Sequence, residues 1–547
     1  MIRAFLAVAS LALLFLLVGA ARVGLAGDYA DPVHRITAQD EALYAASAIH
    51  AATAGGWLTP RFMGRYALYK PPLLIWAAGL SARVLGISRL ALRLPSALAC
   101  ALALGIIFLW AAELRSWQAA VCAALLVASN HLWHVLGSMC MTDALLVAFS
   151  TAALYSLFCD PWLESRAGLW CFSAAVAAAI LTKSVAGFVP LAASALYCIV
   201  APPKYRPRAA RMWLAAGLAL ALAAPWFLYQ LAAHPRWFWT EQVLVEILGY
   251  GAAAPPQTSH ENQALFYLMR LALLDPVLLA LFLVALPGLF RELRRRTPGA
   301  LLVTCWLAVL AASVLVWQYR NVTYLLPVAA PLAIAGAAYG PFSDPRATRW
   351  MLALALAALA AKMAAPAMPW GISFARGTVQ PVAPLVSSYC ARNRANELIL
   401  VDVDDDLYSA ALPLAHLRYC LVDARAGAGP YAMDFASMGV SVTADQFNHL
   451  DRWVPIFRAR LKEWGLDSPS PIATLILAAS PEELAGIVRA HPDSDFLVPG
   501  RYGAAIHAAA ATHQIVPVGS TGVAPHWLLL AYHSHPRPTL PAWSCGL

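Results

Sequence analysis

Charged residues are scarce in this chain. Asp, Glu, Lys and Arg make up 12% of the 547 residues, whereas hydrophobic residues make up 61%. This balance excludes an ordinary soluble domain and a disordered chain. The formal net charge of +9 does not indicate nucleic-acid binding, because the basic residues form short clusters between apolar runs and no basic patch is interleaved with aromatic residues. The composition predicts a polytopic membrane protein.

Cysteines with metal-ligand spacing are also missing. The ten cysteines include no C-x-x-C pair, and most of them lie inside apolar runs, where Cys acts as a small hydrophobic residue. Cys390, Cys420 and Cys545 fall in a more polar C-terminal part. If that part is extracytoplasmic, the sequence permits one disulfide among these three cysteines but does not assign the pair.

Eleven apolar runs are candidate membrane spans. The first, at 5–25, follows Arg3 and is interpreted as a retained span, with a cleaved signal peptide as the alternative. The others lie at 94–112, 119–136, 144–158, 169–181, 185–200, 213–233, 264–286, 301–317, 324–339 and 351–366. A cytoplasmic N-terminus places the basic segments at 204–211, 291–296 and 344–349 inside. The odd number of spans then places the C-terminal part outside.

The apolar segment at 71–86 is interpreted differently. It is shorter than a typical span, it carries Arg83, and a crossing at this point would invert every later loop. We therefore expect a helix that lies on the outer membrane surface, within a first external loop at 28–93.

The sequence changes character near residue 371. Strand-like runs at 397–403, 474–480 and 514–519 alternate with helical stretches. Ser480, followed by a proline and by an acid three residues on, predicts a capped helix start. We expect a transmembrane domain at 1–370 and a small extracytoplasmic α/β domain at 371–547.

Acidic residues lie where the chain leaves the membrane on its outer side. Asp40 and Glu41 are adjacent in "ITAQDEALYA", and Asp143 in "SMCMTDALL" lies at the outer end of another span. Each has a structural alternative: Asp40 closes a capping box with Thr37, and Asp143 caps the helix that starts beside it. The sequence therefore predicts either helix caps or a catalytic acid pair.

Basic residues map to the same outer face. They are Arg61, Arg65, Lys70, Lys183 and Arg320. Taken singly, each is explained as a snorkelling anchor at the membrane surface. Their convergence with the acids favours a site for a lipid phosphate.

The first external loop resembles a known family. The stretch "QDEALYAASAIHAATAGGWLTPRFMGRYALYKPPLLIWAAGL" is similar to the first external loop of GT-C type glycosyltransferases that use lipid-linked sugars. The lipid A aminoarabinose transferases and their protein O-mannosyltransferase relatives are the nearest in pattern, although Gly56 stands where the family often has Asp. "MTDALL", "LTKS", "APWFLY" and "YLLPVAAPLAIA" follow in the family's order, so the resemblance covers about 5–365.

The resemblance implies a reaction and roles for the charged residues. The donor would be a sugar on polyprenyl phosphate, and Asp40 would be the general base in one inverting step, with Glu41 and Asp143 as further catalytic candidates. The cations, with Lys70 as the main candidate, would stabilise the negative charge on the leaving phosphate. No cofactor is implied, because the anchored donor needs no nucleotide and no nucleotide-bound metal. The enzyme would lie in the inner membrane.

Acceptor recognition is where this chain departs from the family. The family carries an "EH" pair and a later His, whereas this chain has Glu241 followed by Gln242, with His260 as the match for the later one. Lipid A, a protein or a surface glycan is left open as the acceptor. The D-x-D spacing at 402–406 leaves a divalent metal open without indicating one.

Two classes without sugar transfer are the alternatives. One is a transporter or flippase of a lipid-linked or anionic substrate, and the other is a membrane scaffold. Transporters place ionisable groups near the bilayer midplane on broken helices, whereas the acids of this chain lie at span ends and in loops. The sequence therefore favours an enzyme.

Overall fold

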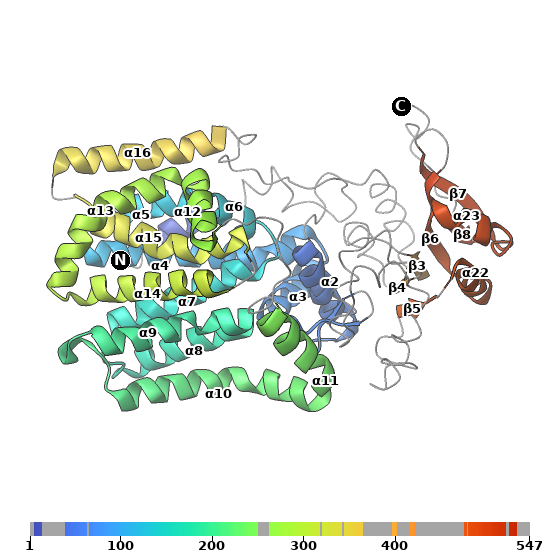
Figure 1. Ribbon diagram of the computed structural model, residues 1–547, viewed down its shortest axis with the longest axis horizontal. Coiled ribbons are helices and arrows are strands. Elements are labelled where there is room, and N and C mark those ends of the chain that lie inside the picture. The colour runs from blue at the N-terminus through green and yellow to red at the C-terminus, as the bar shows by residue number, and fades with distance from the viewer. Residues whose placement is uncertain are drawn as a thin grey trace.

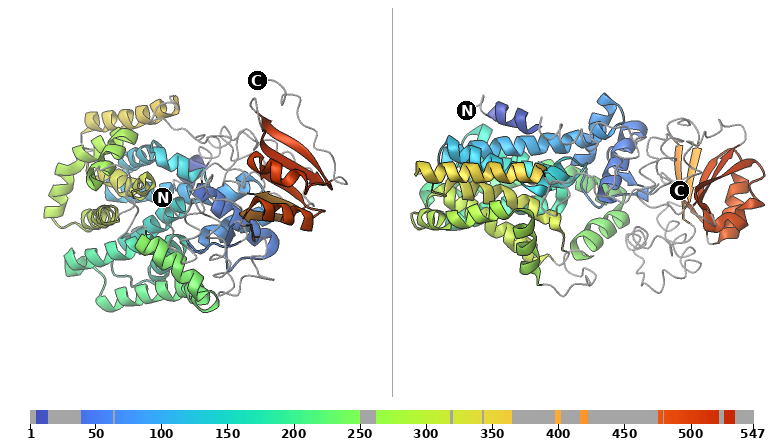
Figure 2. Two further views of the ribbon diagram at one scale, coloured as in Figure 1. Left: turned by 45° about the vertical axis from the view of Figure 1, so that its right-hand side comes forward. Right: turned by 90° about the horizontal axis from the view of Figure 1, so that it is seen from above.

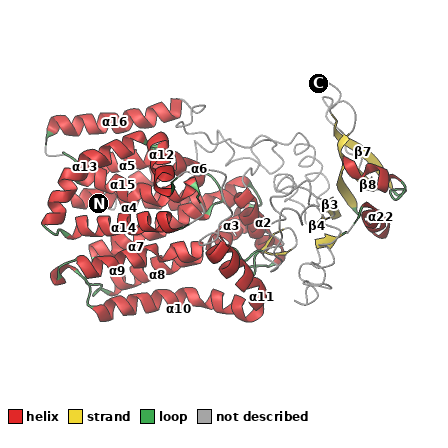
Figure 3. Cartoon of the chain, in the orientation of Figure 1, coloured by secondary structure: helices red, strands yellow, loops and turns green. Residues whose placement is uncertain are grey.

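The protein consists of a helical bundle followed by a small sheet (Figure 1). The computed structural model describes residues 5–13, 39–62, 65–249, 262–317, 320–341, 344–364, 397–401, 416–421, 475–478, 480–520 and 525–532. Helices dominate as far as Ala364, and all strands of the larger sheet come after them in the chain (Figure 3).

Seven stretches of the described residues are long and apolar enough to cross a membrane. They are α4 (Arg89–Leu114), α7 (Thr142–Cys159), Arg166–Val200, Pro203–Ala233, α13 (Pro276–Arg294), α14 (Pro298–Val316) and α16 (Pro345–Ala364). The pair α5 (Trp117–Ala128) and α6 (His131–Gly137) adds an eighth if it forms one span bent by 65°. The predicted polytopic helical membrane protein is confirmed. The count of eleven spans stays a prediction.

The stretch Arg166–Val200 contains two helices with a tight turn between them. They are α8 (Arg166–Lys183) and α9 (Val189–Val200), joined by the 3-10 turn η1 (Ser184–Phe188). Gly187 in this turn lies so close to α8 that a Cβ atom would come 2.4 Å from the backbone of Ala179. In a straight helix, residues this far apart in sequence would be separated by roughly 12 Å. The chain therefore reverses here and leaves Lys183 at the turn.

The apolar run at 264–286 is not one helix, and this differs from the prediction. α12 (Gln263–Leu274) ends at Asp275, whose φ of −137° and ψ of 58° are not helical, and α13 starts at Pro276. The residue before a proline is disfavoured in the helical region, and proline has no N–H to continue the helical hydrogen bonds. Pro276 thus marked the break in the sequence, but the continuous apolar run around it led to the prediction of a single span.

This break meets the break between α5 and α6. The Asp275 carboxylate accepts hydrogen bonds from Nδ2 of Asn130 at 2.7 Å and from the backbone N–H of His131 at 3.3 Å. Lys362, near the end of α16, forms an ion pair with the same carboxylate, and both side chains are buried. A buried pair of this kind is destabilising to break, because one charge would be left uncompensated. The end of α16 is therefore held by contacts at both breaks, the one at Asp275 and the one between α5 and α6.

α15 (Leu326–Ala338) lies in the middle of the bundle. Every residue of α15 except Val328 is buried, and α15 contacts α4, α5, α7, α13 and α14. Gly288 of α13 allows a close approach to the end of α15, since a Cβ atom would lie 2.1 Å from the backbone oxygen of Tyr339. The other described helices between α9 and α16 are η2 (Pro203–Tyr205), α10 (Ala209–Ala233), α11 (Pro235–Phe238), the π-helix η3 (Trp239–Gly249) and the 3-10 helix η4 (Val322–Leu325).

The first loop forms a layer on one end of the bundle. It contains α2 (Gln39–Ala54), the two-stranded hairpin β1 (Arg61–Phe62) and β2 (Arg65–Tyr66), and α3 (Leu73–Leu85). α3 is too short to count among the candidate spans. Its Leu80, Val84 and Leu85 are 58%, 73% and 55% exposed, while its other face packs on α2. These features fit the helix predicted to lie on the membrane surface.

The two ends of the bundle differ in charge. The connections between α9 and α10 and between α13 and α14 lie at the end opposite α2 and α3 (Figure 1). These connections and their flanks carry Lys204, Arg206, Arg208, Arg294, Arg295 and Arg296. In both views of Figure 2, the C-terminal sheet lies beyond the end of the bundle that carries the first loop.

The C-terminal sheet has six strands in the order β5-β4-β3-β6-β8-β7. Pairing is parallel from β5 to β6 and antiparallel for β8 and β7. The strands are β3 (Glu397–Val401), β4 (His416–Leu421), β5 (Leu475–Leu477), β6 (Asp495–Pro499), β7 (His513–Ser520) and β8 (Pro525–Tyr532). Three of them match the predicted strand runs. Cys420 lies buried in β4, whereas Cys390 and Cys545 fall outside the described residues.

α22 (Pro481–Ala490) covers one face of this sheet. Ser480 caps it by accepting a hydrogen bond from the backbone N–H of Glu483 at 3.2 Å, as the sequence predicts. Leu484 and Val488 pack against the inward side chains of the strands, in one core with the 3-10 turn η6 (Gly500–Tyr502) and the short α23 (Gly503–His507). The predicted α/β character of the C-terminal part is confirmed.

Candidate active site

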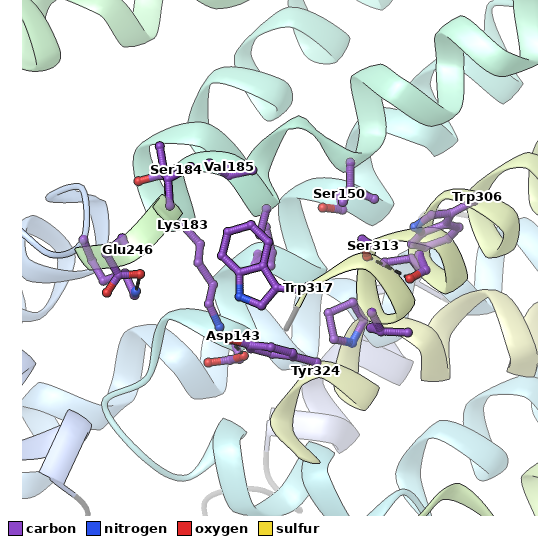
Figure 4. A pocket seen from close by; sticks show the side chains of 18 residues that line it. Asp143, Ser150, Lys183, Ser184, Val185, Glu246, Trp306, Ser313, Trp317 and Tyr324 are labelled. Atoms are coloured by element: carbon purple, nitrogen blue, oxygen red, sulfur yellow. Dashed lines mark hydrogen bonds and ion pairs between the residues drawn. The ribbon is translucent and has the colours of Figure 1, made fainter. Parts of the chain in front are cut away.

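A cavity of about 160 Å³ lies at the end of the bundle that carries the first loop. Its walls come from the first loop, α7, the α8–α9 turn, η3, α14 and η4 (Figure 4). The charged lining residues are Lys70, Asp143, Lys183 and Glu246. The apolar lining includes Leu146, Val189, Ile247, Trp306, Leu310 and Trp317. The cavity therefore joins a charged part to an apolar part.

Asp143 and Lys183 form an ion pair in the cavity. Asp143 lies in the first turn of α7, where the helix dipole favours a carboxylate, and Lys183 is the last residue of α8. Nζ of Lys183 lies 2.8 Å from Oδ1 of Asp143, and 5.4 Å from the ring centroid of Tyr324. In Figure 4, Lys183 extends toward Asp143 beside Trp317 and Tyr324. The structure therefore brings these two predicted site residues together.

The structural alternative for Asp143 was a helix cap. The N-cap position of α7 is Met141, which makes no side-chain cap hydrogen bond. The Asp143 side chain is only 3% exposed and meets Lys183. Asp143 thus belongs to the cavity and is not the capping residue.

A second ion pair, between Lys70 and Glu246, faces the same cavity. Lys70 follows the β1–β2 hairpin, and Glu246 lies on η3. Their side chains are 16% and 17% exposed. π-Helical turns are rare and are frequently found at functional sites. Lys70 was predicted from the sequence, whereas Glu246 was not, because its only signal is that of an isolated acid in the apolar run "QVLVEILG".

The start of η3 holds the first loop in place. The buried carboxylate of Glu241 accepts a hydrogen bond from the backbone N–H of Leu68. Gln242 donates to the backbone oxygen of Leu68 and accepts a hydrogen bond from the Ser184 hydroxyl at 2.8 Å. These contacts connect η3, the first loop and the α8–α9 turn. The acceptor-side role of Glu241 stays a prediction, and its observed contact is structural.

Glu41 lies outside the cavity lining. Arg93 of α4 donates to both carboxylate oxygens of Glu41, from Nε at 2.6 Å and from Nη2 at 2.9 Å. The backbone N–H of Cys140 donates to Oε1 at 2.8 Å, and Glu41 is fully buried. Glu41 therefore links α2 to α4 and to the segment that leads into α7.

Asp40 precedes Glu41 in α2. The contact between Glu41 and Cys140 places the start of α2 beside the segment that leads to Asp143. The side chains of Asp40 and Arg65 lie outside the described residues, as do His260 and the acidic run at 402–406. The roles predicted for them stay predictions.

Arg61 is set apart from the cavity. Its guanidinium carbon lies 5.7 Å from the ring centroid of Tyr66, and that ring lies 4.3 Å from the ring of His234 at the end of α10. Burial, together with the positive charge of Arg61, lowers the pKa of His50 to about 4. Burial also lowers the pKa of Arg61 itself. Arg61 thus lies where the first loop packs on α10, away from the lining residues.

Arg320 lies between α14 and η4. Its guanidinium carbon is 5.7 Å from the ring centroid of Phe266 in α12. The neighbouring Asn321 donates its backbone N–H to the hydroxyl oxygen of Tyr267 at 3.4 Å. Arg320 does not line the cavity, whereas Tyr324 of the following turn does.

Within the ranges that the structure describes, no group of three or more His, Cys, Asp or Glu residues is arranged to hold a metal ion.

The fold of this chain is similar to the folds of solved membrane proteins. ArnT from Cupriavidus metallidurans bound to undecaprenyl phosphate is similar with a TM-score of 0.63 at 16% identity, covering 94% of this chain and 97% of that one. The archaeal oligosaccharyltransferase AglB from Archaeoglobus fulgidus is similar with a TM-score of 0.51 at 12% identity, over 75% and 63% of the two chains.

Comparisons of sequence point to particular relatives. Residues 69–229 match the family model described as dolichyl-phosphate-mannose-protein mannosyltransferase. Undecaprenyl phosphate-alpha-4-amino-4-deoxy-L-arabinose arabinosyl transferases from Aeromonas salmonicida and Aeromonas hydrophila are 28% and 29% identical to this chain. Each alignment covers 55% of both proteins, so the chain spans about half the length of the curated relatives it matches. The resemblance predicted from the first external loop is confirmed.

Proposed function

We propose that this chain is an integral membrane glycosyltransferase. It moves a sugar from a polyprenyl-phosphate donor to an acceptor hydroxyl or phosphate on the outer face of the inner membrane. The cavity carries this proposal, because it places two lysines and a buried carboxylate beside an apolar wall. A lipid-linked phosphate needs both a cationic and an apolar part of a site. The arabinosyl transferases named above support the choice of donor.

The chemistry is a single displacement at the anomeric carbon. The acceptor oxygen forms a bond to that carbon while the bond to the phosphate oxygen breaks, and the phosphate leaves with the electron pair. Asp40 is the proposed base that takes the proton of an acceptor hydroxyl. Asp143, which Lys183 holds beside the cavity, is the second candidate. Lys70 and Lys183 offset the charge that develops on the leaving phosphate.

The transporter alternative lacks a comparable observation. The described ionisable groups of the cavity lie in the first loop and at helix ends, and the sequence relatives are named as transferases. Mass spectrometry would identify the acceptor as lipid A, a protein or a glycan. Lipid A, glycans and envelope proteins from cells with and without this chain would be compared.

The proposed arrangement has two domains. Residues 1–370 form the membrane domain, with the first external loop at 28–93, and residues 371–547 form an extracytoplasmic domain. The basic connections at one end of the bundle support a cytoplasmic assignment for that end. The position of the sheet beyond the opposite end supports an external assignment for the C-terminal part (Figure 2).

Exchange of the proposed base tests the function directly. Purified Asp40→Asn is expected to transfer sugar from a polyprenyl-phosphate donor about 10²- to 10⁴-fold more slowly than the wild type, because it removes the proton acceptor and keeps the size of the side chain. Asp493→Asn, at an exposed turn of the C-terminal domain, is the matched control and should transfer at the wild-type rate. Wild-type turnover by Asp40→Asn together with loss of turnover in Asp143→Asn would move the base to Asp143. Wild-type turnover by both would contradict the proposal.

A further inference from the structure

Among the described lining residues of the cavity, positive and negative side chains are equal in number. Its charged lining residues are two lysines and two carboxylates, and each lysine is paired with one carboxylate. A polyprenyl phosphate brings an additional negative charge. Strong binding of that charge therefore requires at least one lysine to exchange its carboxylate for the phosphate.

We propose that Glu246 is a displaceable counter-ion that occupies Lys70 in the empty cavity and competes with the donor phosphate for it. This inference rests on the proposed function, because it takes the ligand to be a polyprenyl phosphate. Glu246 and Lys70 both line the cavity, and they come from η3 and from the first loop. The ion pair thus adds to the Leu68 contacts that join η3 to the first loop until the phosphate replaces the carboxylate.

Glu246 is easier to displace than Asp143. Asp143 has a short side chain that is 3% exposed, and it lies in the first turn of a regular helix whose dipole favours its charge. Glu246 is 17% exposed, has a longer side chain, and lies on a π-helix, whose hydrogen-bond pattern is rare in proteins. The two lysines are equally exposed, at 16% each, so the carboxylates make the difference: that of the Lys70 pair is the more accessible to water and the easier to displace.

The anchors at the start of η3 allow Glu246 to move without releasing the whole segment. Glu241 and Gln242 keep their hydrogen bonds to the Leu68 backbone, and Ser184 keeps its hydrogen bond to Gln242. These contacts do not involve the Glu246 side chain. Rotation of the Glu246 side chain away from Lys70 is therefore a local change.

Direct binding of undecaprenyl phosphate to the full-length protein in detergent tests this inference. Glu246→Gln is expected to bind the phosphate roughly three- to tenfold more tightly than the wild type, because the competitor for Lys70 loses its charge. Undecaprenol, the uncharged alcohol with the same chain, should bind equally to both. In a Lys70→Met background, Glu246→Gln should have no effect. Glu292→Gln, which removes an acid paired with Arg295 at the opposite end of the bundle, is the matched control and should leave binding unchanged.

The outcomes separate the inference from the proposed function. Equal or weaker phosphate binding by Glu246→Gln, or the same gain in the Lys70→Met background, would overturn the counter-ion role. Glu246→Ala is the second variant, and unfolding of both Glu246 variants would also overturn it, since the residue would then be required for the fold. A wild-type protein that binds undecaprenyl phosphate no better than undecaprenol would instead refute the proposed donor.

Discussion

At the scale of single residues, the carboxylates at the first-loop end of the bundle differ in their partners and in their exposure. Glu41 meets Arg93 through two hydrogen bonds and is fully buried, so its charge is used to hold three segments together. Asp143 and Glu246 meet lysines that face a cavity. The sequence shows only that each is an acid near a membrane boundary. The partner and the exposure of each carboxylate decide whether it can reach a substrate.

Removal of the Glu41 charge is expected to affect stability rather than chemistry. Glu41→Gln removes the negative charge that Arg93 meets in this buried pair, and breaking a pair of this kind is destabilising by about 3–5 kcal/mol. A thermal unfolding scan in detergent should give a clearly lower Tm, with turnover per folded molecule close to that of the wild type. The double variant Glu41→Gln/Arg93→Gln should recover part of the Tm. An unchanged Tm with lost turnover would assign Glu41 to the chemistry instead.

At the scale of elements, close backbone contacts position the cavity walls. The α8–α9 turn presents Lys183 and Ser184 to the cavity because the chain reverses at η1, and Gly187 permits that reversal. η3 presents Glu246 because its first residues are fixed to the Leu68 backbone. Each wall is thus set by backbone contacts of residues that are not among the described lining residues themselves.

A pair of glycine variants distinguishes this contact from ordinary helix packing. Gly187→Ala would place a Cβ atom 2.4 Å from the Ala179 backbone, whereas Gly217→Ala in α10 would meet no atom within 4 Å. Gly187→Ala should lower the free energy of unfolding by about 1–3 kcal/mol through overpacking. Gly217→Ala should leave it unchanged or raise it by up to about 1 kcal/mol through helix propensity. Equal Tm values for the two variants in detergent would contradict the observed reversal.

Local patterns in the sequence predicted much of the fold. Apolar runs gave most of the membrane helices, and Ser480 gave the start of α22, because these signals act over a few residues. The break at Asp275 was concealed in an apolar run, although Pro276 marked it. The strands β4, β6 and β8 were not predicted from the sequence.

The candidate site could be predicted only in part. Lys70, Asp143 and Lys183 were named from their outer positions and from the family resemblance, and the structure brings them to one cavity. Their partners were not predicted, because Lys70 and Glu246 lie 176 residues apart and only the folded chain brings them together. The same applies to Arg93 beside Glu41, which lie 52 residues apart.

At the scale of the whole molecule, one end of the bundle gathers the first loop and the cavity. The opposite end carries the basic connections (Figure 1). α16 leads from the basic end toward the side of the sheet, and Lys362 fastens its last turns to Asp275. A domain that follows α16 therefore emerges on the side of the cavity, where an acceptor would arrive.

Labelling of single cysteines tests this orientation. In a chain without other cysteines, a membrane-impermeant maleimide applied to intact spheroplasts should modify Arg83→Cys and Arg501→Cys, and should not modify Arg295→Cys until the membrane is opened. All three positions have exposed side chains. Labelling of Arg295→Cys in intact spheroplasts would invert the arrangement and would place the cavity on the cytoplasmic side.

The paired charges of the cavity also affect how strongly the cavity attracts the anionic phospholipids of the bilayer. A bilayer contains anionic phospholipids whose phosphates would compete by mass action for any lysine that stood alone at its surface. Because Lys70 and Lys183 already have carboxylate partners, the resting cavity presents only a weak field to such headgroups. A ligand must then fit the apolar wall as well as offer a phosphate. Under the proposed function, the ion pairs would favour a scarce lipid phosphate with the right chain over abundant lipids of similar charge.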